Sequence, residues 1–125
     1  MKKSSMKRVL IVEDEEHIAN AEKMILEDDY HVIMANDGLR GFDLAKKEKP
    51  DLIVLDLMLP GMNGFDICKK IKNDKTLKDI KIVMVTAKNE EKDEIKGMKL
   101  GADDYIMKPF EAIELKHVVK QVLNK

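Results

Sequence analysis

The feature that most constrains the fold is a short apolar run that ends on one carboxylate and is followed directly by turn residues. Residues 52–55 are all aliphatic, and Asp56 comes directly after them. Such a run is typical of a strand that is covered on both faces in a parallel sheet. Pro60-Gly61 and Asn63-Gly64 then predict a turn. We expect Asp56 at the carboxyl end of a buried strand, where open α/β sheets place their chemistry, although an Asp here can also simply cap the turn.

Similar apolar runs recur along the chain and alternate with helical patterns. The other expected strands are residues 9–12, 30–35, 81–85 and 104–107, and the expected helices are about 15–28, 37–49, 64–73, a segment ending at Gly101, and 111–123. With right-handed crossovers, this alternation predicts an α/β fold with a parallel five-stranded sheet and helices on both faces. The flavodoxin-like (βα)5 three-layer sandwich has this architecture with strand order 2-1-3-4-5, an order that comes from the fold class and not from the sequence.

The helical patterns also predict which side chains face the core. The expected inward residues are Ile18, Ala21 and Ile25 in the first helix, Leu39, Phe42 and Ala45 in the second, and Phe65, Cys68 and Ile71 in the third. Cys68 is the only cysteine, so it forms no internal disulfide, and at this spacing it is expected to be a core thiol.

Length and charge limit the classes of protein. The 125 residues suit one domain, predicted over 8–125 after a flexible leader at 1–7. With 23 basic and 24 acidic residues the formal charge is −1, which gives no indication of direct nucleic-acid or anionic-membrane binding. The apolar runs are too short for a membrane span. Together with the single cysteine, this predicts a soluble, cytoplasmic protein.

Polar residues follow four of the five expected strands. They are Glu13 with Asp14, then Asp56, Thr86 and Lys108. In a sheet of order 2-1-3-4-5 the three acids become neighbours, and they repel one another by about 4 kcal/mol per pair at 4 Å. A hard cation such as Mg²⁺, or Mn²⁺, relieves this repulsion and accepts phosphate oxygens. Lys108 and Thr86 can then hold a phosphoryl group, with Asp56 as the nucleophile that forms an acyl phosphate.

The chain resembles a known family through several short motifs in a fixed order. These are Glu13-Asp14, residues 56–64, Thr86-Ala87, residues 101–105 and residues 108–110. Over residues 8–125 the sequence is similar to the receiver domains of bacterial two-component response regulators, such as the chemotaxis regulator.

The resemblance implies a phosphoacceptor that takes part in signalling and is not an enzyme. Asp56 would accept a phosphoryl group from a sensor histidine kinase or a histidine phosphotransfer protein. Asp14, Asp56 and the Met58 backbone carbonyl would bind Mg²⁺ directly, and Glu13 would bind it through water. Lys108 would pair with a phosphate oxygen, and its bond to Pro109 would be cis.

The resemblance also implies a switch. Thr86 would move toward the phosphoryl group and Tyr105 would swing inward behind it. The fourth helix, fifth strand and fifth helix would then present a changed face to a downstream protein target. Such a domain is expected to be a monomer, or a dimer that depends on phosphorylation.

Other interpretations remain open from the residues alone. Thr86 can simply end its strand, Lys108 can be a surface amine, and Tyr105 can be a half-buried strand residue. A flavodoxin-like ligand binder is a rival, although it would prefer a glycine- or hydroxyl-rich loop after the first strand. An aspartate-nucleophile phosphatase is another, although such enzymes usually carry a second Asp where this chain has Met58.

Overall fold

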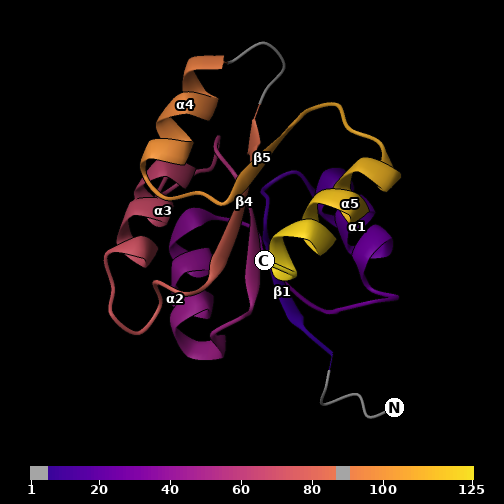
Figure 1. Cartoon of the computed structure of the whole chain (residues 1–125), viewed down its shortest axis with the longest axis horizontal. Helices are drawn as coiled ribbons and strands as arrows, with labels where there is room; N and C mark the ends of the chain where they lie inside the picture. Colours follow the sequence, from indigo (N-terminus) through magenta and orange to yellow (C-terminus); the bar gives the residue numbers. More distant parts are fainter. Residues whose placement is uncertain (1–5, 87–90) are drawn as a thin grey trace.

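Strands and helices alternate along the whole chain (Figure 1). The computed structural model describes residues 6–86 and 91–125. The strands are β1 (Arg8–Val12), β2 (His31–Ala35), β3 (Leu52–Asp56), β4 (Lys81–Thr86) and β5 (Asp104–Met107). The helices are α1 (Glu16–Leu26), α2 (Gly38–Glu48), α3 (Gly64–Lys72), α4 (Glu91–Lys99) and α5 (Ala112–Leu123). Within the described part of the chain, no helix has the length and apolar character needed to cross a membrane.

The strands form one parallel sheet in the order β2-β1-β3-β4-β5. Helices α2, α3 and α4 lie on one face of the sheet, and α1 and α5 lie on the other (Figure 1). The predicted flavodoxin-like α/β fold is therefore confirmed. Because the order reverses at β1, the carboxyl ends of β1 and β3 lie beside each other at the switch point.

Side chains of the central strands contribute to two separate hydrophobic cores, one on each face of the sheet. In β1, Leu10 and Val12 point to the core under α2, α3 and α4, whereas Val9 and Ile11 point to the core under α1 and α5. Strands β3 and β4 alternate in the same way. This alternation explains why these runs are apolar throughout, because in a sheet covered on both faces every side chain is buried.

The buried face of helix α1 is shifted by one residue from the predicted face. Its buried side chains are Ala19, Glu22 and Leu26, whereas Ile18 and Ile25 are half-buried and Ala21 is exposed. The prediction for Ala21 was therefore wrong, and a glutamate occupies the buried stripe.

Helix α2 is also turned, and glycines explain the difference. Leu39 and Phe42 were predicted to face the core with Ala45, but Leu39 is 58% exposed and Phe42 is half-buried. Gly38, Gly41 and Ala45 are the buried residues of this helix. A Cβ added to Gly41 would lie 2.8 Å from the side chain of the last residue of β1. The helix thus packs on the sheet through its smallest residues.

Candidate functional site

The sheet register brings the acids of β1 and β3 together. Val12 pairs with Leu55 in the parallel ladder between these strands. The residue after Val12 is Glu13 and the residue after Leu55 is Asp56, so the two carboxylates start from neighbouring positions. Asp14 follows at the start of the loop to α1. The convergence predicted from the switch point is thus present in the structure.

The same register extends across β4 and β5. Asp56 pairs with Val85, and Thr86 pairs with Met107. The ladder continues one step further, because the amide of Lys108 donates a hydrogen bond to the Thr86 carbonyl at 2.7 Å. All the predicted polar residues at the strand ends therefore lie along one edge of the sheet.

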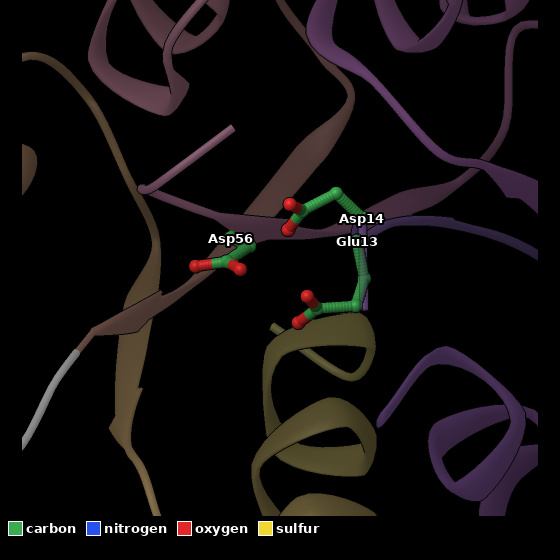
Figure 2. A group of neighbouring side chains, drawn as sticks. All are labelled: Glu13, Asp14 and Asp56. Carbon is green, nitrogen blue, oxygen red and sulfur yellow. The ribbon is translucent and has the colours of Figure 1, made fainter. Parts of the chain in front are cut away.

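The three acids form one cluster, in which one ligand oxygen from each of Glu13, Asp14 and Asp56 lies within 4.8 Å of the others. Figure 2 shows the carboxylates gathered at the ends of their strands. Glu13 and Asp56 are buried, at 2% and 5% exposure, whereas Asp14 is exposed. The cluster therefore has a buried floor and one acid open to solvent.

Lys108 supplies a positive charge to this cluster. Its Nζ donates a hydrogen bond to Asp56 Oδ2 at 3.1 Å and lies 3.1 Å from Glu13 Oε1. Burial opposes the charge on the ammonium, but Asp56 and Glu13 raise the pKa of Lys108 above its ordinary value. Burial, together with the neighbouring Asp56, raises the pKa of Glu13 to about 7. One ammonium thus compensates three acids only in part.

At this edge of the sheet, two buried side-chain oxygens of the described residues keep unused hydrogen-bonding capacity. Glu13 Oε1 faces the ammonium as an ion pair but, like Thr86 Oγ1, has no hydrogen-bond partner among the described residues. The other oxygen of Glu13 accepts from the Glu15 amide at 3.0 Å, and Asp56 Oδ1 accepts from the Met58 amide at 3.2 Å. Buried polar atoms of native proteins are usually paired, so both oxygens are available for a bound group.

A hollow of about 740 Å³ opens beside the cluster. Glu13 and Asp14 form one side of it. Asn36 and Asp37 of the β2–α2 connection and Arg40 of α2 form another. The hollow gives a partner or small molecule access to the acids from the β2 side.

The remaining predicted residues lie close by. Met58 is 78% exposed beyond the end of β3, and Tyr105 is half-buried in β5 and packs against the core under α2, α3 and α4. The Lys108–Pro109 peptide bond is cis, as the resemblance implied. Ala87, the second residue of the Thr86-Ala87 motif, lies outside the described residues. The roles assigned to Met58, Thr86 and Tyr105 stay predictions.

One charged residue near the site was missed by the sequence reasoning. Glu22 is 1% exposed, and its pKa is raised to about 8 by burial and then by repulsion from Glu13. A glutamate in an amphipathic helix is normally exposed, so only its spacing with Ala19 and Leu26 could have indicated burial.

The donor set suits a hard divalent cation. Three carboxylates within reach of one another supply the oxygen ligands that Mg²⁺ and similar ions prefer, and among the described residues the buried Oε1 of Glu13 accepts no hydrogen bond. The residues present therefore fit a metal at this position.

The fold and the site together define a class: flavodoxin-like domains with an acidic pocket, suited to a divalent cation, at the carboxyl edge of the sheet. Sequence comparison narrows the class to one family. The family model described as "Response regulator receiver domain" matches residues 9–120, and the chain belongs to that family. A receiver domain of this kind is a signalling phosphoacceptor and not a true enzyme.

Individual relatives agree with this assignment. The chain is 45% identical over 120 residues to the alkaline phosphatase synthesis transcriptional regulatory protein PhoP of Bacillus subtilis, covering 95% of this chain and 49% of that protein. It is 39% identical to the phosphate regulon transcriptional regulatory protein PhoB of Escherichia coli, covering 95% and 52%. The chain thus spans about half the length of these relatives.

Solved structures show the same fold. A response regulator from Chloroflexus aurantiacus superposes with a TM-score of 0.93 at 33% identity, covering 97% of this chain and all of that one. The chemotaxis response regulator CheY4 of Vibrio cholerae superposes with a TM-score of 0.89 at 29% identity, covering 94% and 99%.

Proposed function

We propose that Asp56 accepts a phosphoryl group from a phosphohistidine on a sensor histidine kinase or a histidine phosphotransfer protein. The observation that supports this most directly is the position of Lys108, whose Nζ lies 3.1 Å from Asp56 Oδ2. An ammonium at this distance can offset the negative charge that a phosphoryl group brings to Asp56. Aspartate carboxylates form covalent acyl phosphates in this kind of chemistry.

In the proposed transfer, a carboxylate oxygen of Asp56 attacks the phosphorus and forms a P–O bond as the P–N bond to the donor imidazole breaks. The imidazole leaves with the bonding electron pair and takes a proton. Lys108 neutralises one phosphoryl oxygen, and the hydroxyl of Thr86, which has no hydrogen-bond partner in residues 6–86 and 91–125, donates a hydrogen bond to another. Positioning and charge neutralisation account for most of such catalysis, so no general base is needed.

We further propose Mg²⁺, or Mn²⁺, as the cofactor. Asp14, Asp56 and the Met58 carbonyl would hold the ion, and Glu13 would contribute through water. When bound, the ion offsets the negative charge of the acids and of the transferring phosphoryl group. This assignment is supported by the shared position of the three carboxylates.

Phosphorylation would change the surface formed by α4, β5 and α5. Thr86 and Tyr105 would change position when the phosphoryl group arrives, and the face would then bind a downstream protein target. Exposed apolar side chains on this face support a binding role: Ile95, Met98, Met107 and Ile113.

Location and assembly belong to the same proposal. A cytoplasmic location is consistent with one buried, unpaired thiol, Cys68. The domain would be a monomer, or a dimer that forms on phosphorylation.

The proposal is tested by incubation with a small acyl phosphate and Mg²⁺, followed by intact mass measurement. The wild-type protein and Asp43→Asn, which changes an exposed acid on α2, should gain one phosphoryl group that hydroxylamine removes. Asp56→Asn should gain none. A phosphoryl adduct on Asp56→Asn would show that another residue is the acceptor.

A further inference from the structure

Glu22 is a buried carboxyl group to which the proposed function gives no role. It occupies the middle of the buried stripe of α1 and is 1% exposed. Neither of its carboxylate oxygens has a hydrogen-bond partner within the part of the chain that the structure describes. An unpaired buried carboxyl is unfavourable, and much more so when it is charged. Such a group is expected to be neutral unless positive charge comes near.

The charged groups that act on Glu22 belong to the functional site. They are Glu13 and Asp56, which repel a negative charge, and Lys108, which attracts it. These groups come from the ends of β1, β3 and β5, so Glu22 experiences the electrostatic field of the acid cluster while forming no hydrogen bond with it.

The elements packed against α1 add little other charge. They are β1, β2 and α5, and the side chains that they bury on this face are apolar. Their remaining charged or titratable groups are the half-exposed Arg8 at the far end of β1, and the exposed His31, Glu114, Lys116, His117 and Lys120. The field at Glu22 is therefore dominated by the acid cluster and by Lys108.

We propose that Glu22 is an outer carboxylate of the cation site, which strengthens divalent-cation binding from inside the fold and releases its proton as the cation binds. This inference rests on the metal site of the proposed function. Two positive charges arriving among Glu13, Asp14 and Asp56 offset the repulsion that keeps Glu22 neutral. The carboxyl group then ionises, its proton goes to solvent, and the new negative charge attracts the cation.

The effect of the cation on the ionisation of Glu22 and the effect of that ionisation on cation affinity are equal in size, because the two equilibria are linked. If the cation favours the ionised form of Glu22 by some factor, the ionised form favours the cation by the same factor. The raised pKa of Glu22, about 8, leaves the residue mostly protonated at neutral pH and so able to release a proton on binding. Couplings between sites are typically five-fold or more, which is measurable.

The test is calorimetric titration with Mg²⁺ alone, at pH 7 and pH 8, in pairs of buffers that differ in ionisation enthalpy. The proteins are the wild type, Glu22→Gln, and Glu27→Gln as a control at an exposed position just after α1. We expect the wild type and Glu27→Gln to release more protons per bound ion than Glu22→Gln. At pH 8 we expect Glu22→Gln to bind Mg²⁺ roughly five-fold or more weakly. Equal affinity and equal proton release would overturn the inference.

A second measurement does not depend on a variant. In wild-type protein with ¹³C-labelled glutamate side chains, the Glu22 carboxyl resonance is followed against pH with and without saturating Mg²⁺. A lower apparent pKa with Mg²⁺ is expected, and an unchanged one contradicts the inference.

The outcomes separate this inference from the proposed function. If the wild type forms the phosphoryl adduct and binds Mg²⁺ but Glu22 shows no coupling, only the role of Glu22 is wrong. If the wild type binds no Mg²⁺, both the role of Glu22 and the proposed metal site are wrong.

Discussion

Glu22 and Lys108 are two residues whose charge is set by where the fold places them. Glu22 is an acidic residue buried among apolar side chains, whereas the ammonium of Lys108 lies between two carboxylates. Burial raises the pKa of Glu22, and the acids beside Lys108 raise the pKa of its ammonium despite burial. At neutral pH the first residue is mostly neutral and the second is charged.

We predict that Glu22→Gln increases the free energy of unfolding in metal-free buffer, and increases it more at pH 8 than at pH 5. The pKa of Glu22 is raised from 4.5 to about 8, so the folded state binds more protons than the unfolded state over this range. The free energy of unfolding of the wild type therefore falls as pH rises from about 4.5 to about 8. A glutamine at this position cannot ionise, so the variant does not lose this stability. The gain should be roughly 2 to 4 kcal/mol at pH 8 and small near pH 5, measured by urea unfolding. A gain that does not depend on pH would show that Glu22 is already ionised in the folded state.

We predict that Lys108→Met has opposite effects on metal binding and on phosphorylation. The ammonium lies 3.1 Å from oxygens of both Asp56 and Glu13, so it repels a divalent cation in the same pocket. Mg²⁺ affinity, measured by calorimetry, should rise several-fold. The rate of phosphoryl uptake from an acyl phosphate should fall at least about tenfold, because one charged interaction with the transferring group is lost. Lys116→Met, at an exposed position on α5, is the control and should change neither. Weaker Mg²⁺ binding in Lys108→Met would contradict the electrostatic account.

Contacts between elements hold the loop that follows Asp56. This loop crosses the start of α2, where the amide of Gly38 donates a hydrogen bond to the Pro60 carbonyl at 3.1 Å. A Cβ added to Gly38 would lie 1.7 Å from the Met62 carbonyl oxygen, which is backbone and cannot rotate away. The glycine at the start of α2 therefore permits a close contact between two elements.

We predict that Gly38→Ala destabilises the domain by about 2 kcal/mol or more, because α2 and the loop must separate. It should also slow phosphoryl uptake by Asp56, since the loop directly follows β3. Urea unfolding measures the first effect and intact mass against time the second. Asp43→Ala, at an exposed position in the same helix, should change stability by less than about 0.5 kcal/mol. Unchanged stability in Gly38→Ala would mean that the contact is easily rearranged.

At the scale of the whole domain, the proposed switch links the acid cluster at the edge of the sheet to the α4–β5–α5 face. Converting a domain from 1:99 to 99:1 between two states requires a difference of about 5.5 kcal/mol. Lys108 directly follows β5, and Thr86 is the last residue of β4, the strand that pairs with β5. The proposed movement of these two residues would therefore act first on the α4–β5–α5 face.

We predict that phosphorylation changes amide hydrogen exchange in α4, β5 and α5 and leaves α2 nearly unchanged. The reason is that, in the proposed switch, Thr86 and Lys108 would move toward the new negative charge, whereas α2 contributes no residue to the acid cluster. Exchange is compared by mass spectrometry with and without an acyl phosphate, and Asp56→Asn should show no difference. Changes concentrated in α2 would indicate a different route for the signal.

Much of this molecule could be predicted from the sequence, because the relevant signals are local. Aliphatic runs such as residues 52–55 indicate strands buried on both faces, and turn residues such as Pro60 mark where the chain leaves the sheet. Acids at the ends of two such runs already indicate a site, because parallel strands place their carboxyl ends at one edge. The fold class and the members of the acid cluster followed from these patterns.

Other features depended on contacts between distant residues. The direction in which α1 and α2 face is set by which side chains fit against the sheet, so glycines in α2 and a glutamate in α1 are buried where apolar neighbours were expected. The distances from Lys108 to the two acids and the burial of Thr86 and Glu22 arise only when the elements pack. Periodicity describes one element at a time, whereas packing is a property of pairs of elements, and for this reason the sequence determined the members of the site and the tertiary structure determined their charge states.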